Sequence, residues 1–165
     1  MALDYHIIKN TNKETVLSVS GANDTLSIAL TSLASADQQL GATGAAGATG
    51  AVINVVSVIT SGNINSAMSI RRGATGATGH LVFVGSPENV PTVQFNQYGF
   101  TENGQNNKDI LVTHGGATGA LVTSYIVLHK QDGFYSKVQY EQYGAYDDET
   151  RVGASTTLVG SPDKA

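Results

Sequence analysis

The chain has 165 residues, 41% of them hydrophobic and only 13% charged, so it can bury one core while its surface carries unusually few charges. The formal net charge of -4, without a dense cluster of Lys and Arg, argues against a protein that neutralises nucleic-acid phosphates. Cysteine is absent, which excludes a disulfide framework, a thiolate nucleophile and Cys-based metal sites.

The first residues, Met1 to His6, lack the basic start and the apolar stretch of a signal peptide. No uninterrupted apolar run approaches the roughly 20 residues of a membrane-spanning helix. We therefore expect a soluble protein that is made in a cytoplasm and has no membrane partner.

Alternation of apolar and polar residues, which is typical of half-buried strands, dominates the chain. Leu17 and Val19 alternate with small polar residues, as do Leu26 and Ile28. The Asn-rich segment 10–12 is expected to turn the first two strands into a hairpin. Further strand-like segments are 51–60, 66–72, 80–85, 108–114 and 125–130. This spacing predicts an all-β fold, namely an antiparallel β-sandwich of jelly-roll-like or Ig-like type.

Helical patterning is weak throughout the sequence. The best candidate is the segment 32–40, where Ser32 or Ser35 would cap one or two turns.

The tetrapeptide Gly-Ala-Thr-Gly recurs, beginning at Gly41, Gly47, Gly73, Gly76 and Gly116. A collagen-like interpretation fails because the stretch 41–50 has no proline and only about three triplets. We interpret these segments as low-complexity loops, or as segments that do not represent the natural sequence, and assign no function to them.

The final part of the sequence is rich in tyrosine. Tyrosine suits interfaces because its large apolar ring ends in a hydroxyl that tolerates partial wetting, although a last strand packing on its own core is an alternative. We predict a β-sandwich domain over residues 1–133 and an extended C-terminal arm over residues 134–165. The predicted interface residues of the arm are Phe134, Tyr135, Tyr140, Tyr143, Tyr146 and Arg151.

Signatures of catalysis and of metal binding are absent from the sequence. No Gly-x-Ser-x-Gly elbow or phosphate-binding glycine loop occurs, and the histidines are scattered singly at His6, His80, His114 and His129. The acidic run 147–149 lacks the glycine pattern of a calcium loop and is expected to be a solvated turn that pairs with Arg151. We therefore predict no catalytic residues, no metal site and no cofactor.

The two ends of the sequence, 3–17 (LDYHIIKNTNKETVL) and 135–162 (YSKVQYEQYGAYDDETRVGASTTLVGSP), resemble a family of small virion structural proteins from contractile-tailed phages of marine cyanobacteria. The Gly-Ala-Thr segments do not fit that family's pattern. The resemblance implies a component of the phage particle without known catalytic activity, and it carries over no catalytic residue.

We expect a virion structural protein that is assembled in the host cytoplasm and is not an enzyme, specifically a capsid decoration subunit that stabilises the head shell. Its expected partners are copies of itself, as a trimer or larger oligomer, and the major capsid protein or the neck and tail proteins. The alternative within the virion is a neck, tail or fibre-attachment component, and a hydrolase is a remote third class.

The alternative from another class is a host-surface glycan-binding module, because β-sandwiches often bind sugars through polar loops. Its candidate residues are Asn96, Tyr98, Asn103 and Asn106. The absence of tryptophan, the residue most typical of sugar stacking, disfavours it.

Overall fold

The computed structural model describes residues 2–40, 50–73, 79–95, 105–117 and 119–136. Nearly all regular structure in these residues is β-strand, which confirms the predicted all-β class. The elements are β1 (Asp4–Asn10), β2 (Glu14–Gly21), β3 (Asp24–Ile28), the 3₁₀ turn η1 (Leu30–Leu33), β4 (Gln38–Leu40), β5 (Val52–Gly62), β6 (Met68–Arg72), β7 (His80–Gly85), β8 (Thr92–Gln94), β9 (Ile110–His114), β10 (Val122–Asp132) and β11 (Phe134–Ser136).

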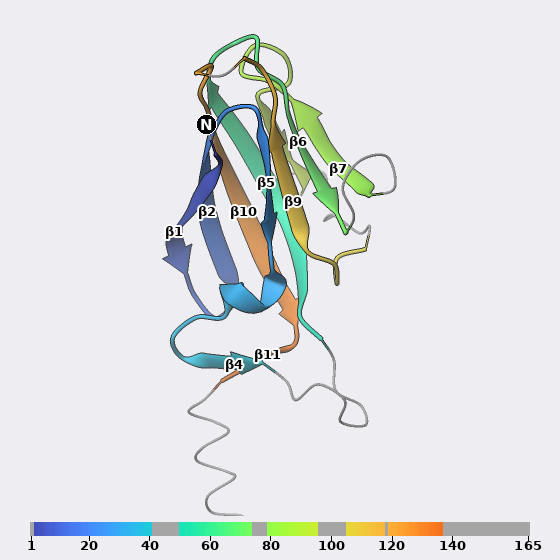
Figure 1. Ribbon diagram of the computed structural model, residues 1–165. Helices are drawn as coiled ribbons and strands as arrows, with labels where there is room; N and C mark the ends of the chain where they lie inside the picture. The colour runs from blue at the N-terminus through green and yellow to red at the C-terminus, as the bar shows by residue number, and fades with distance from the viewer. Residues whose placement is uncertain (1, 41–49, 74–78, 96–104, 118, 137–165) are drawn as a thin grey trace, which may run out of the picture.

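Nine of the eleven described strands form two packed sheets whose connectivity is that of a jelly roll, and β4 and β11 form a separate two-stranded sheet (Figure 1). Among the described residues, sheet A has the order β1-β2-β10-β5-β8 and sheet B the order β3-β9-β6-β7. The antiparallel pairs β6–β7, β5–β8, β3–β9 and β2–β10 are nested within one another along the chain. The chain therefore runs out and returns as one long folded hairpin, which gives the jelly-roll form of the predicted sandwich.

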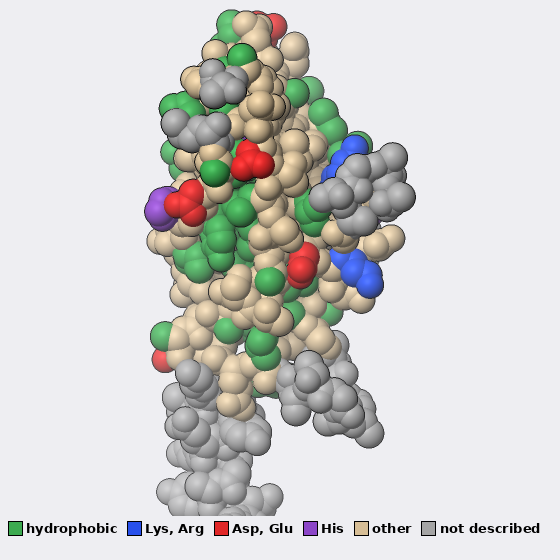
Figure 2. Space-filling model, viewed as in Figure 1, with side chains coloured by type: hydrophobic (Ala, Val, Ile, Leu, Met, Phe, Trp, Pro, Cys, Tyr) green, Lys and Arg blue, Asp and Glu red, His purple; other side chains and the backbone are tan. Residues whose placement is uncertain are grey.

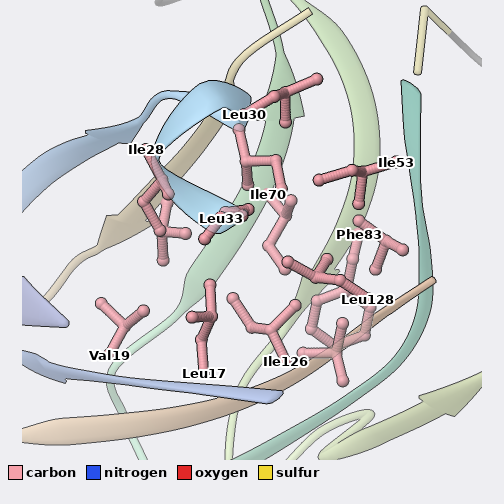
Figure 3. Packing of buried hydrophobic residues seen from close by; sticks show 14 of the residues in the cluster. Leu17, Val19, Ile28, Leu30, Leu33, Ile53, Ile70, Phe83, Ile126 and Leu128 are labelled. Carbon is pink, nitrogen blue, oxygen red and sulfur yellow. The ribbon is translucent and has the colours of Figure 1, made fainter. Parts of the chain in front are cut away.

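Alternation along each strand builds the core between the sheets. In β2, Leu17 and Val19 are fully buried, whereas the alternate residues Val16 and Ser18 are half-buried on the outer face. Figure 3 shows the side chains of β2 and β10, such as Ile126, directed toward residues of sheet B such as Ile70. Burial of such side chains, at about 25 cal/mol per Å² of apolar area, is the main force that holds the sheets together.

The first hairpin is present as predicted, since β1 pairs with β2 around the turn at residues 11–13. Helical structure is sparse, as the weak patterning indicated. In the best candidate segment, 32–40, the one turn is η1, which begins earlier and has no side-chain cap at its N-terminus, and Gln38–Leu40 form β4. Ser32 Oγ donates a hydrogen bond back to Ala29 O (2.7 Å). The backbone of β4 pairs with β11 instead of continuing a helix.

Most residues of the Gly-Ala-Thr repeats lie outside the described ranges. Of those described, Gly73, Gly116 and Gly119 adopt positive φ in connections between strands. At Gly116 (φ 95°) a Cβ would lie 2.3 Å from Ser66 Oγ, so only glycine fits there. This glycine therefore has a local structural role.

A fully buried arginine ties sheet B to sheet A. Arg72, at the end of β6, donates hydrogen bonds from Nη1 to Lys108 O (2.7 Å) and from Nη2 to Ile53 O in β5. Hydrogen bonds from a buried cation are stronger than those between neutral groups, and a carbonyl left without its donor is costly. The guanidinium thus links two strands and the segment before β9.

We predict that Arg72→Met destabilises the fold by about 2 to 4 kcal/mol, because the apolar stem stays while both carbonyls lose their donor. Arg71→Met is the matched control. The neighbouring Arg71 is half-buried and donates one hydrogen bond, to Gly79 O (3.2 Å), so its loss should cost less than about 1 kcal/mol. Urea unfolding of both variants measures the difference, and equal costs would contradict the role of Arg72.

A buried histidine connects three strands in its neutral form. His114 Nδ1 lies 3.2 Å from Gly21 O, and Nε2 lies 2.7 Å from Ser124 Oγ. Because a carbonyl can only accept, Nδ1 carries the proton and Nε2 accepts from the Ser124 hydroxyl. Burial lowers the pKa of His114, and the hydrogen bond to Gly21 O only partly opposes this effect.

The lowered pKa of His114 predicts that the protein loses stability in mild acid. As pH falls below about 6.5, the histidine of the unfolded chain binds a proton while the folded one stays neutral, so the free energy of unfolding decreases. In His114→Gln this dependence should be weaker, although the variant is less stable at neutral pH. Urea unfolding between about pH 5 and 7.5 tests this, and an unchanged slope in the variant would refute it.

Candidate interaction surfaces

The outer side of sheet A is an uncharged surface built by four neighbouring strands. The strand registers place alternate residues of β2, β10, β5 and β8 on this side, away from the core. We call it the outer A face. It consists of Val16, Ser18, Ser20, Ser57, Ile59, Ser61, Thr92, Gln94, Thr123, Tyr125 and Val127.

The centre of the outer A face is apolar, and most of the residues around it are Ser and Thr. Tyr125 lies opposite Ile59 across the β10–β5 pair, and these side chains are 40% and 43% exposed. Val127 lies opposite Val16 in the β10–β2 pair. Ser20 and Thr123 hydrogen-bond to each other (3.1 Å) beside this centre. A large exposed aromatic ring next to an exposed isoleucine, without a charge between them, is typical of contact surfaces.

Charged residues occur at the lower rim of this face, near the β1–β2 turn. Glu14 accepts a hydrogen bond from Lys9 Nζ (2.7 Å) and lies 3.5 Å from His129 Nε2. The hydrogen bond from Lys9 is the main reason why the pKa of Glu14 is lowered. Such exposed pairs contribute little stability. Along the β1 side of the face, Asp4 and His6 are also exposed, opposite Ser20 and Ser18.

A second apolar surface lies along the side of the sandwich where β1 and β3 are the outermost strands. Within the described residues sheet A has five strands and sheet B four, and β1 pairs only with β2. Tyr5 and Ile7 of β1 lie on the core side, but Ile7 is 41% exposed; Leu26 of β3 is half-buried. Figure 2 shows hydrophobic side chains gathered on this side of the molecule. We call it the β1–β3 edge.

The start of the predicted arm is part of the folded body. Phe134 and Tyr135 lie in β11, which pairs with β4 below the sandwich, and Phe134 packs against the core while Tyr135 is 43% exposed (Figure 1). The remaining predicted contact residues lie outside the described residues, so their role stays a prediction. They are Tyr140, Tyr143, Tyr146 and Arg151.

A lysine anchors the small β4–β11 sheet to the sandwich. Lys130 Nζ donates hydrogen bonds to Asn10 Oδ1 (2.6 Å), Thr11 O (2.8 Å) and Gln38 Oε1 (2.7 Å), and it lies 5.2 Å from the centroid of the Phe134 ring. All of these partners are neutral. Desolvation by burial lowers the pKa of this lysine to about 8. One ammonium thus joins β10, the β1–β2 turn, β4 and β11.

We predict that Lys130→Met destabilises the protein by about 1 to 2 kcal/mol, since the stem remains but three hydrogen bonds are lost. The pH dependence of the free energy of unfolding shows whether the buried ammonium of Lys130 contributes to this difference. The folded protein loses this proton near pH 8 and the unfolded chain near 10.5, so between these values the unfolded state binds more protons and stability rises with pH.

Urea unfolding from pH 7 to pH 10 should show this rise in the natural protein and a weaker one in Lys130→Met. Lys13→Met, which removes a charge from the exposed β1–β2 turn, is the control and should keep the rise. An identical pH dependence in all three proteins would contradict the lowered pKa of Lys130, and an unchanged stability of Lys130→Met at pH 7 would contradict its anchoring role.

The structure places the four histidines apart. His114 is buried, while His6, His80 and His129 are exposed on different strands. Among the described residues, no group of three or more His, Cys, Asp or Glu side chains is placed to hold a metal ion. The acidic run 147–149 lies outside this part of the chain.

Of the glycan-binding candidates, Asn106 alone falls within the described residues. Its amide donates to Asn54 Oδ1 (2.7 Å) and to Gln131 Oε1 (3.4 Å), and Asn54 in turn donates to Gln131 (2.7 Å). These contacts use the Asn106 donor group to hold the segment before β9 against β5 and β10. Asn96, Tyr98 and Asn103 lie outside the described residues.

Sequence reasoning did not identify the outer A face or the β1–β3 edge. Their residues occur as ordinary alternation within strands, and the register between strands distant in sequence is needed to see that they adjoin. The described part of the chain contains no helix long and apolar enough to cross a membrane. In comparisons with known proteins, no family model matches the chain and no curated protein matches it significantly.

Proposed function

We propose that the protein is a structural subunit of a phage virion, in the first place a capsid decoration subunit, which acts by packing against copies of itself and against shell proteins. A neck, tail or fibre-attachment position is the alternative within the particle. The resemblance of both chain ends to small virion proteins supports the proposal, and jelly rolls are common in capsid proteins. Fold alone does not assign function, so the surfaces must carry the argument.

The observation that carries the proposal is the incompletely covered β1–β3 edge. In β1, Tyr5 and Ile7 lie on the core side. Tyr5 packs against the core with its hydroxyl 3.4 Å from Ser32 Oγ of η1, whereas Ile7 remains 41% exposed. A strand added to the free edge of β3 would face β1 and cover Ile7. Edge strands readily pair with another chain, and natural proteins usually protect them.

The body also provides a firm origin for contacts by the C-terminal residues. Phe134 is held by the core and by Lys130, and β11 by its pairing with β4. Residues from 137 onward then supply the predicted arm contacts. Weak contacts at the β1–β3 edge and weak contacts by the arm, each repeated around a symmetric particle, would add up to strong attachment.

We predict that the tagged full-length chain, supplied during infection, copurifies with phage particles at a fixed copy number. Ile7→Lys should reduce its incorporation at least about tenfold, because a charge on an apolar edge opposes burial. Val84→Lys is the matched control, since Val84 is 52% exposed on the outer side of β7, away from this edge, and it should incorporate normally.

A chain that ends at Ser136 tests the arm in the same experiment, because it retains Phe134 and β11. Its midpoint of thermal unfolding should match that of the full chain, and its incorporation should fall. Absence of the full-length chain from particles would refute the proposed function. Normal incorporation of the shortened chain would refute the role of the arm.

The glycan-binding alternative makes a different prediction for the purified protein. A glycan array should be silent if the subunit only packs against other proteins. Specific binding of one glycan class, lost on substitution of the polar residues in 96–107, would replace the proposed function.

A further inference from the structure

We propose that the outer A face is a two-fold interface at which two copies of this chain pack sheet against sheet. The inference rests on the proposed function, because it specifies how copies of the proposed structural subunit contact each other. It concerns a different surface from the β1–β3 edge. Its basis is the combination of side-chain types that the strand registers bring together.

A two-fold interface must be complementary to itself, because the same surface patch occurs on both sides. Hydroxyls meet this requirement, since each one both donates and accepts a hydrogen bond and can pair with its own kind. Six of the eleven residues of the outer A face are Ser or Thr, namely Ser18, Ser20, Ser57, Ser61, Thr92 and Thr123.

Charge also favours a second copy as the occupant. The chain has a formal net charge of -4, so two copies repel each other at most orientations. The eleven residues of the outer A face include no carboxylate, lysine, arginine or histidine, and the ionisable residues of β1 that adjoin it, Asp4, His6 and Lys9, lie opposite Ser20, Ser18 and Val16 at its border. The eleven residues themselves therefore bring no like charges together when two copies pack through them.

The apolar centre supplies the attraction. Tyr125 and Ile59 are adjacent near the middle of the face and substantially exposed, and in a two-fold pair they would be covered by the same residues of the second copy. Tyrosine at the centre of a flat patch, surrounded by groups that exclude water, is a frequent source of binding energy.

The size of the face predicts weak pairing. Four strands at about 4.8 Å spacing and five to six residues at about 3.3 Å span roughly 19 by 18 Å. This footprint of roughly 340 Å² per copy is below the roughly 800 Å² per partner of a stable specific interface, so the pairing is expected to be transient, with a dissociation constant in the micromolar range or above.

The test measures the mass of the purified full-length chain by sedimentation from about 1 µM to about 1 mM. We expect a concentration-dependent monomer–dimer equilibrium. Tyr125→Lys should raise the dissociation constant at least about tenfold, whereas Tyr125→Phe should preserve association because the ring remains. Val84→Lys adds the same charge on the outer side of sheet B and should leave the equilibrium unchanged.

The side chains of Tyr125 and Val84 are both exposed, so all of these variants should unfold at the same temperature as the natural protein. Equal unfolding temperatures separate a loss of pairing from a loss of the fold. Three outcomes would overturn the inference: a monomer at every concentration in the range, a trimer, or a dimer that persists in Tyr125→Lys. So would equal weakening by Val84→Lys.

Particle incorporation distinguishes this inference from the proposed function. A chain that is monomeric in solution but enters particles would refute the two-fold interface and leave the proposed function intact; loss of incorporation in Tyr125→Lys would then assign the face to another virion protein. A dimer through this face that is absent from particles would refute the proposed function and support the interface.

Discussion

The insertion of β10 between β2 and β5 is the constraint on which the rest of the structure depends. Strand β10 pairs along most of its length with both neighbours, although β2 lies more than 100 residues earlier in the chain. This pairing closes the nested hairpin and aligns the core residues of three strands. It also positions Ser124 against His114 and Lys130 against the β1–β2 turn. A change in register by one residue would turn every side chain of β10 to the opposite face.

The same registers divide the strands into two chemically different sides. Leu17, Ile126 and Val58 face the core, whereas Ser18, Tyr125 and Ile59 in the neighbouring row face outward. The outward residues of β2, β10, β5 and β8 in these rows carry no charge, and the ionisable residues Asp4, His6 and Lys9 of β1 adjoin them on the same side of the sheet. At its border, β1 extends beyond the last strand of sheet B and leaves apolar residues partly exposed. Both interaction surfaces are thus consequences of sheet geometry.

Much of the fold could be predicted from the sequence, because strands with one buried face alternate visibly, as β2 does around Leu17 and Val19. The segments β4, β8 and β11 were missed because three residues are too few to show a period. The buried roles of Arg72 and His114 could not be predicted either, since single polar residues in a strand give no sign of partners 10 to 93 residues away. The interaction surfaces were missed for the same reason, since Tyr125 and Ile59 become neighbours only through long-range pairing.

On the proposed function, the protein acts through the shape and chemistry of its sheet faces and edge. A reconstruction at residue resolution of the phage particle that this proposal requires tests it most directly. It should show the jelly roll repeated around the particle, with Ile7 covered by a neighbouring chain and β1 and β3 at the contact. A particle without this subunit, or one in which the β1–β3 edge and the outer A face both remain open to solvent, would contradict it.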